Sequence, residues 1–235
     1  MIDQQTIYQY IQNGKIEEAL QALFGNIEEN PTIIENYINA GIVLADANEI
    51  EKAERFFQKA LTIDPKNGVV FFNLANVYYN QQRYQEAIKL YQQALQTEIE
   101  QVDCNYMIGM AFNQLESFKL ALPYLMTAAE LDKDKDAEVQ FQYGLVLCQL
   151  EMFNEAITQL KHVLTIDKNH VDARYNLGLA LFMKNEDIDE AITHFKEAVD
   201  KHLLSQHAQD TIWGVEGDVY LALFTELLQN KFQNK

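Results

Sequence analysis

The stretch VVFFNLANVYY, residues 69–79, decides the fold of this chain. Its apolar residues recur at the i, i+3, i+4 and i+7 spacing that defines one face of an α-helix. They are Phe71, Leu74, Ala75 and Tyr78. After a short polar turn, a second run with helical spacing begins at Tyr84. The stretch therefore predicts a pair of amphipathic helices, and such a pair needs similar neighbours because it cannot bury its apolar faces alone.

Small residues show that this unit repeats along most of the chain. One series lies at intervals of 34 or 35 residues, and it consists of Gly41, Ala75, Gly109, Gly144 and Gly178. A second series keeps nearly the same interval, and it consists of Ala19, Ala53, Ala87, Ala121, Ala156 and Ala191. A glycine within a helix costs about 1 kcal/mol relative to alanine. We therefore expect the glycines to permit a close approach of the two paired helices.

The pattern resembles the tetratricopeptide repeat, a helix–turn–helix unit of 34 residues. The unit at 34–67 contains the residues of that motif at Tyr37, Ala40, Gly41, Leu44, Ala53, Phe57, Ala60 and Pro65. The predicted repeats are 1–33, 34–67, 68–101, 102–135, 137–170 and 171–205, with a capping helix at 210–230. The resemblance implies an all-α fold, a right-handed α-solenoid of stacked helix pairs that forms one domain over residues 1–235.

Composition and charge exclude several classes of partner. The chain has 18 basic and 35 acidic residues, and its net charge of −17 opposes binding to nucleic acid or to an anionic membrane surface. No secretory signal and no apolar run of membrane-spanning length is present, so we expect a cytoplasmic protein. The two cysteines, Cys104 and Cys148, are interpreted as free thiols, with a disulfide as the alternative.

Motifs for catalysis or for cofactor binding are absent from the sequence. No phosphate-binding loop, nucleophile elbow or dinucleotide fingerprint is found. The histidines fit no metal-ligand spacing, and they are His162, His170, His194, His202 and His207. The charged run at 131–138 is interpreted as a solvated turn rather than a metal loop. We therefore expect no enzyme activity, no cofactor and no metal site.

The resemblance implies a ligand-binding surface on the first helix of each repeat, at the second, fifth, sixth, ninth and twelfth places. The fifth places are mostly aromatic, and several of the others are amides. The predicted groove residues are Ile38, Asn39, Phe72, Asn73, Asn76, Tyr79, Tyr106, Met110, Asn113, Phe141, Tyr175 and Asn176. Aromatic rings and amides suit an extended peptide. The alternative is that these residue types are common at these places in the family and serve packing between repeats.

The second places are acidic in four repeats, at Glu35, Asp103, Glu138 and Asp172. They would attract a basic and apolar segment. The alternative is that each carboxylate only stabilises the start of its helix through the helix dipole. The clamp that related co-chaperones use for the carboxylate end of heat-shock proteins is rejected, because its lysines and arginines are missing here.

The function predicted from these features is a non-catalytic adaptor that binds an extended peptide or a disordered segment of another protein. The alternative is a module for self-assembly through the terminal helices, in particular the segment from Trp213 to Phe224. A monomer is the expected state. Pro123 lies inside a predicted helix, and we expect it to cause a slight bend rather than to act as a hinge.

Overall fold

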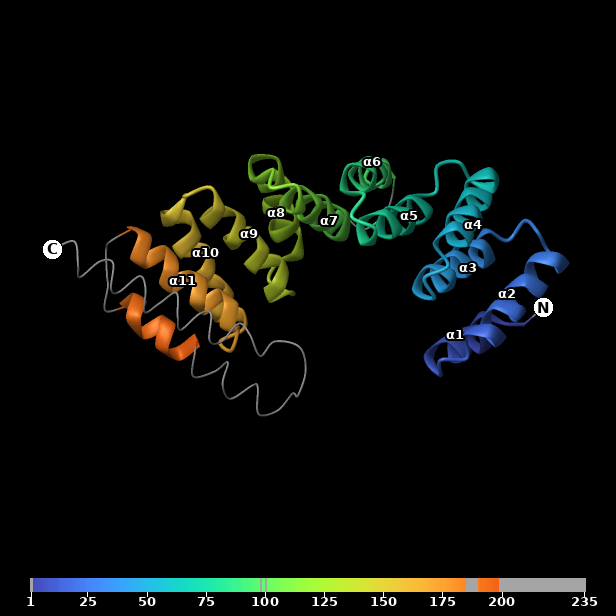
Figure 1. The fold of residues 1–235 in the computed structure, drawn as a ribbon, viewed down its shortest axis with the longest axis horizontal. Helices are drawn as coiled ribbons and strands as arrows, with labels where there is room; N and C mark the ends of the chain where they lie inside the picture. The colour runs from blue at the N-terminus through green and yellow to red at the C-terminus, as the bar shows by residue number, and fades with distance from the viewer. Residues whose placement is uncertain (1, 98, 100, 185–189, 199–235) are drawn as a thin grey trace. The chain divides into compact units, whose positions relative to one another are not determined.

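The protein is described by a computed structural model that covers residues 2–97, 99, 101–184 and 190–198. Within these residues the secondary structure is helical and contains no strand (Figure 1). The helices are α1 (Gln4–Gln12), α2 (Ile16–Glu29), α3 (Ile34–Asp46), α4 (Ile50–Ile63), α5 (Gly68–Asn80), α6 (Tyr84–Ala94), α7 (Gln101–Gln114), α8 (Phe118–Asp132), α9 (Ala137–Gln149), α10 (Phe153–Ile166) and α11 (Val171–Lys184), followed by a helical stretch at 190–198. The predicted all-α repeat fold is confirmed.

The chain divides into two compact units, Met1–Ser117 and Phe118–Lys235. The boundary falls within the fourth predicted repeat, between α7 and α8. The single domain expected from the sequence stays a prediction. The predicted capping helix at 210–230, with the segment from Trp213 to Phe224, lies outside the described residues.

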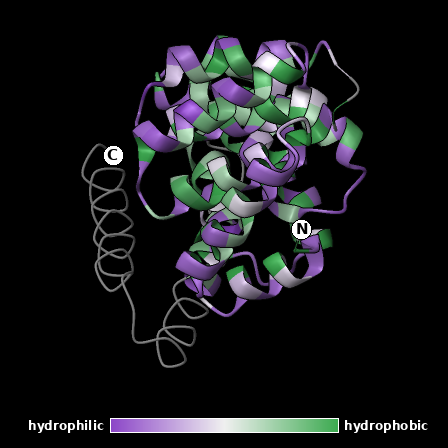
Figure 2. Ribbon diagram, turned by 90° about the vertical axis from the view of Figure 1, so that its right-hand side faces the viewer, coloured by the Kyte–Doolittle hydropathy of each residue, from purple (hydrophilic) through white to green (hydrophobic). Residues whose placement is uncertain are grey.

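Helix pairs form each unit, and successive pairs pack against one another. In the first unit α3 packs on α4 and α5 on α6, while in the second unit α9 packs on α10 and α10 on α11. Figure 2 shows hydrophobic and hydrophilic residues alternating around these helices. The second helix of each pair contributes a large, fully buried side chain, and these include Phe57, Tyr91, Leu125 and Leu160. Burial of such side chains supplies most of the stability that isolated amphipathic helices lack.

The small residues of the first helices lie where the paired helices come close. A Cβ atom at Gly41 would lie 2.8 Å from the ring of Phe57, and one at Gly144 would lie 3.0 Å from Cδ2 of Leu160. Both distances are shorter than ordinary van der Waals contact. The predicted role of these glycines in close helix approach is confirmed at both positions.

The turn inside each of the first five pairs contains one residue with a left-handed backbone. These residues are Gly14, Asn48, Gln82, Glu116 and Glu151, with φ between 52° and 68°. The residue after each one closes the turn with a hydrogen bond to the preceding helix, as in Arg83 N–H to the Tyr78 carbonyl at 2.9 Å. This is the Schellman pattern that ends helices. The positions recur at 34 or 35 residues, although only one of them is a glycine.

Pro123 lies inside α8, and the helix continues beyond it to Asp132. The hydroxyl of Thr127 donates a hydrogen bond to the Pro123 carbonyl at 2.8 Å. Proline lacks a backbone N–H, so one helical hydrogen bond is missing at this point. The arrangement agrees with a structural role for Pro123 within a continuous helix.

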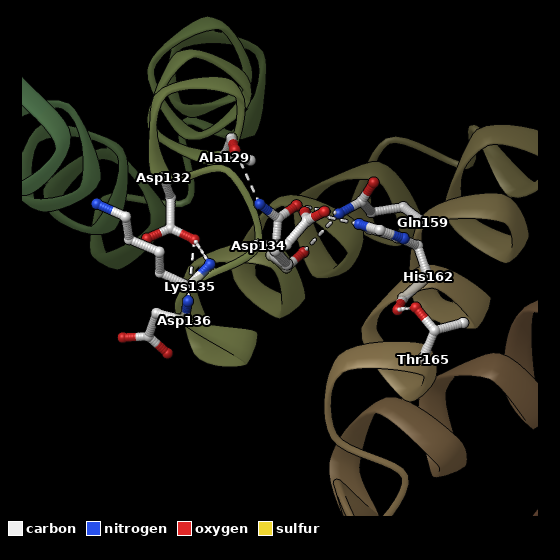
Figure 3. Close-up of polar contacts among 9 residues, drawn as sticks. Ala129, Asp132, Asp134, Lys135, Asp136, Gln159, His162 and Thr165 are labelled. Atoms are coloured by element: carbon white, nitrogen blue, oxygen red, sulfur yellow. Dashed lines mark hydrogen bonds and ion pairs between the residues drawn. The ribbon is translucent and has the colours of Figure 1, made fainter.

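The charged run at 131–138 forms a turn that its own side chains stabilise (Figure 3). The carboxylate of Asp132, which is 6% exposed, accepts hydrogen bonds from the backbone N–H groups of Lys135 and Asp136. Asp134 lies 2.8 Å from Nε2 of His162 on α10. In the part of the chain that the structure describes, no group of three or more side chains is arranged to hold a metal ion. The run therefore serves as the inter-repeat turn that the sequence predicted.

Candidate peptide-binding groove

An open groove of about 480 Å³ lies in the first unit, along α3, α5 and α7. Its lining residues are Ile42, Ala45, Asp46, Phe57, Phe72, Asn73, Asn76, Val77, Tyr79, Asn80, Asp103, Tyr106 and Met107. All but Phe57 belong to the first helices of their pairs. The groove therefore lies on the helix layer for which the sequence predicted ligand contacts.

Three aromatic side chains give the groove its apolar surface. Phe72 and Tyr106 are half-buried, and the Phe72 ring packs 5.5 Å from that of Tyr91. Tyr79 contacts Tyr84 edge-on at 5.2 Å. Burial, together with the nearby Tyr84, raises the pKa of Tyr79, so its hydroxyl stays protonated at neutral pH and can donate a hydrogen bond.

Two asparagines on α5 are held in defined orientations. The Nδ2 group of Asn73 donates a hydrogen bond to the Val69 carbonyl at 2.8 Å. The nitrogen of this amide therefore points toward its own helix. The Oδ1 atom of Asn76 accepts a hydrogen bond from the Tyr91 hydroxyl at 2.6 Å. Burial raises the pKa of Tyr91, which is fully buried, and this hydroxyl therefore remains a donor. Asn73 is left with an acceptor and Asn76 with a donor for a bound molecule.

The charged residues of the groove are both acidic. Asp46 is the last residue of α3, and Asp103 lies in the first turn of α7. No lysine, arginine or histidine is among the residues that line this groove. The electrostatic character of the site therefore favours a cationic or neutral ligand.

Five of the predicted site residues line the groove together, namely Phe72, Asn73, Asn76, Tyr79 and Tyr106. Other predicted residues of the first unit lie outside its lining. Ile38 is 8% exposed and belongs to a core cluster, while Asn39 donates a hydrogen bond to Gln4 at 3.0 Å. Met110 and Asn113 are half-buried, and Oδ1 of Asn113 is buried without a hydrogen-bond partner.

The two predicted aromatic residues of the second unit are buried in its core. Phe141 is 5% exposed and packs 4.6 Å from the ring of His170, and Tyr175 is 8% exposed and packs 5.4 Å from Phe195. Asn176 donates to the Asp172 carbonyl at 2.8 Å. Of the aromatic residues at the fifth places, Phe72 and Tyr106 are half-buried, whereas neighbouring side chains cover Phe141 and Tyr175. The ligand-binding role of these places stays a prediction.

Several groove residues were missed by the sequence analysis, among them Ile42, Ala45 and Val77. Two more of them, Asp46 and Asn80, end their helices. Each is the thirteenth residue of its repeat and the last residue of its helix, one place beyond the positions taken from the family. A polar residue at the end of an otherwise apolar helix was the available signal. Met107, at a sixth place, was also omitted.

The acidic second places have different surroundings in the two units. Asp103 lines the groove of the first unit, and Glu35 is exposed. In the second unit, Glu138 accepts a hydrogen bond from Gln142 at 2.6 Å and lies 3.5 Å from Nε2 of His170. The hydrogen bond with His170 lowers the pKa of Glu138, and this carboxylate thus has partners within its own unit.

The two cysteines are free, as expected from the sequence. Burial raises the pKa of each thiol, Cys104 and Cys148, to about 11. Both are therefore protonated at neutral pH, which makes them poor nucleophiles. Among the described helices, none combines the length and apolar character that crossing a membrane requires.

Comparison with known proteins agrees with this architecture. Models of the tetratricopeptide repeat match residues 44–98, 72–138 and 172–202, and a TPR repeat model matches 144–185. The solved structure of YrrB, described as a TPR protein with an unusual peptide-binding site, is 35% identical, with a TM-score of 0.70. The match covers 82% of this chain and 100% of that one. The chain therefore belongs to the tetratricopeptide repeat family.

More distant relatives share the fold. The structure of PilF from Pseudomonas aeruginosa superimposes with a TM-score of 0.74 at 20% identity, over 94% of this chain and 95% of that one. Anaphase-promoting complex subunit 3 of Schizosaccharomyces pombe is 24% identical over 76% of this chain, and a TPR repeat-containing protein of Methanocaldococcus jannaschii is 25% identical over 77%. The matched regions are 26% and 31% of those two proteins, so the chain corresponds to about a quarter to a third of their length.

Proposed function

We propose that this chain is a non-catalytic adaptor that binds an extended segment of another protein in the groove of its first unit. The observation that carries the proposal is the pair of oriented amides, Asn73 and Asn76, beside accessible aromatic rings. The family is one of protein-interaction scaffolds, which supports the general role. The groove supports the more specific one.

The amides match the hydrogen-bonding needs of an extended backbone. A peptide that binds without forming its own secondary structure has N–H and C=O groups that need partners. Asn73 offers an oxygen and Asn76 an NH₂ group, one turn apart on the same helix. The chain itself contains an example of such pairing, because the buried Asn26 amide bonds both the N–H and the C=O of Ile2, each at 2.7 Å. An asparagine on a helix of this fold can thus hold another residue by its backbone N–H and C=O groups.

The aromatic rings would cover the side chains of the bound segment. Phe72 and Tyr106 combine a large apolar area with few rotatable bonds, and such residues often dominate binding energies. The groove is open and its occupant must lose conformational entropy, so we expect micromolar affinity. The similarity to YrrB, whose description names a peptide-binding site, also supports a peptide as the ligand.

The proposal includes the setting in which the adaptor works. We propose a cytoplasmic monomer whose partner segment is basic and apolar, without a cofactor, a metal or a nucleic acid. The net charge of −17 supports the exclusion of nucleic acid, since phosphate would be repelled. Self-assembly through the terminal helices is not pursued, because its residues lie outside the described part of the chain.

The test is selection of short random peptides on the full-length chain by phage display, followed by titration of a labelled selected peptide. Phe72→Ala and Tyr106→Ala should each weaken binding by about 1–2 kcal/mol, roughly five- to thirty-fold, measured by fluorescence anisotropy. The matched control is Phe24→Ala, since this ring on α2 is 36% exposed and lies outside the groove. Failure to enrich any peptide, or unchanged binding by both groove variants, would contradict the proposal.

A further inference from the structure

The two helix layers of the first unit differ in their charges. Its first helices, α1, α3, α5 and α7, contain no lysine, arginine or histidine, and their charged residues are Glu35, Asp46 and Asp103. The basic residues within its second helices are Lys52, Arg55, Lys59 and Lys89. Among the helices of this unit, basic residues are therefore confined to the second helices, while Lys15, Lys66 and Arg83 lie in the turns.

The helix dipole accounts for two of the three acidic residues. Glu35 and Asp103 lie in the first turns of α3 and α7, where a carboxylate is stabilised by the positive end of the helix. Asp46 is the last residue of α3, where the same dipole disfavours a negative charge. The corresponding last residues of α5 and α7 are the neutral amides Asn80 and Gln114. Local helix energetics therefore give no reason for a carboxylate at Asp46.

The composition of the groove lining offers an explanation for the carboxylate at Asp46. Asp46 and Asp103 line it from two different helices, and no basic residue lines it with them. Tyr79 and Tyr106 belong to the same lining, and aromatic rings can attract cations. An occupant with a positive charge would meet the Asp46 carboxylate in a site that has no basic lining residue and that also offers aromatic rings.

We infer that the segment bound in the groove places a lysine or arginine side chain against Asp46. This inference rests on the proposed function, because it specifies the ligand of the same groove. Asp46 then acts as the residue that selects for a cationic side chain, while Asn73 and Asn76 bind the backbone and contribute no selectivity among side chains.

The experiment uses the peptides selected on the full-length chain. Their sequences should be enriched in lysine and arginine relative to the starting library, and enrichment in aspartate or glutamate would overturn the inference. Replacing the enriched lysine of one selected peptide by acetyl-lysine or glutamine should weaken binding about tenfold, and Asp46→Asn should weaken binding of the unmodified peptide by a similar factor.

The control for long-range charge is Glu51→Gln, which makes the same change in net charge at an exposed position on α4 outside the groove. It should leave the affinity within about twofold, since exposed charges are screened over roughly 10 Å. Equal weakening by Asp46→Asn and Glu51→Gln would contradict a contact at Asp46. The unfolding temperature of Asp46→Asn should not fall, because the wild-type carboxylate opposes the helix dipole.

The outcomes separate this inference from the proposed function. If Phe72→Ala weakens binding of the peptide and Asp46→Asn does not, the cation contact is wrong and the peptide groove stands. If neither variant has an effect, the groove itself is wrong.

Discussion

The hydroxyl group of Tyr91, in one repeat of the first unit, has no counterpart at the same place in the repeats of the second unit. In the first unit Phe72 packs on Tyr91, and in the second unit Tyr175 packs on Phe195 at the corresponding places. The Tyr91 hydroxyl donates to Asn76, whereas the residue that corresponds to Asn76 in the second unit is Leu179, which packs against the core. A buried hydroxyl needs a hydrogen-bond partner. Tyr91 in the core therefore requires a polar residue such as Asn76 on the groove-lining helix.

The comparison shows how one repeat motif produces two kinds of surface. Phe72 stays half-buried beside a groove with oriented amides, while Tyr175 is only 8% exposed. The units also differ in their titratable groups, because all five histidines of the chain lie after residue 160 and the first unit has none. Three sets of substitutions test how far these differences reach.

The largest effect is expected at the glycines of the helix contacts. Gly41→Ala should destabilise the protein by about 1–3 kcal/mol, because the new Cβ meets the rigid Phe57 ring at 2.8 Å. Gly144→Ala should change stability by less than about 1 kcal/mol, since the end of the flexible Leu160 side chain can move and alanine favours the helix. Urea unfolding followed by circular dichroism measures both. A greater loss of stability for Gly144→Ala than for Gly41→Ala would contradict this order of the two helix contacts.

The next effect concerns the hydroxyl itself. Tyr91→Phe should cost about 1–2 kcal/mol, because it leaves Oδ1 of Asn76 without its partner. Adding Asn76→Leu should recover a large part of this loss, since the second unit combines leucine and phenylalanine at the same places. The double-mutant cycle from urea unfolding gives the coupling energy. If the two losses simply add, the amide and the hydroxyl are independent and the comparison fails.

The smallest effect is a pH dependence of stability between pH 5.5 and 7.5, which should come from a histidine and hence from the second unit. Burial and the nearby Arg174 lower the pKa of His194 below its ordinary value of 6.5. Protonation therefore favours the unfolded chain, and this contribution to stability is present above pH 6.5 and is lost as the pH falls toward the lowered pKa. Glu138, whose pKa is lowered from 4.5, contributes only at more acidic pH.

Thermal unfolding of the wild type and of His194→Gln near pH 7.5 and pH 5.5 measures this effect. The wild type should lose more stability than the variant over this interval. His162→Gln is the matched control, because the His162 side chain is 40% exposed beside Asp134. An identical pH dependence in wild type and His194→Gln would exclude His194 as the source.

The sequence by itself determined the repeat and the core. The spacing of apolar residues fixes which face of each helix is buried, and the recurring small residues fix where paired helices touch. Gly41 facing Phe57 is an example, since both residues were placed by the motif before any contact was known. Such features depend on neighbours within about 20 residues, so the pattern along the chain contains them.

The tertiary structure alone decided which motif positions form a site. Phe141 and Tyr175 occupy the same place in the repeat as Phe72, but side chains from other helices cover them. The left-handed turns at Gln82 and Glu151 gave no sequence signal, because residues other than glycine occupy them. The orientation of the Asn76 amide and the place of Asp46 in the groove likewise depend on contacts between helices. Accessibility and amide orientation are set by what packs against a residue, and a one-dimensional pattern does not contain that information.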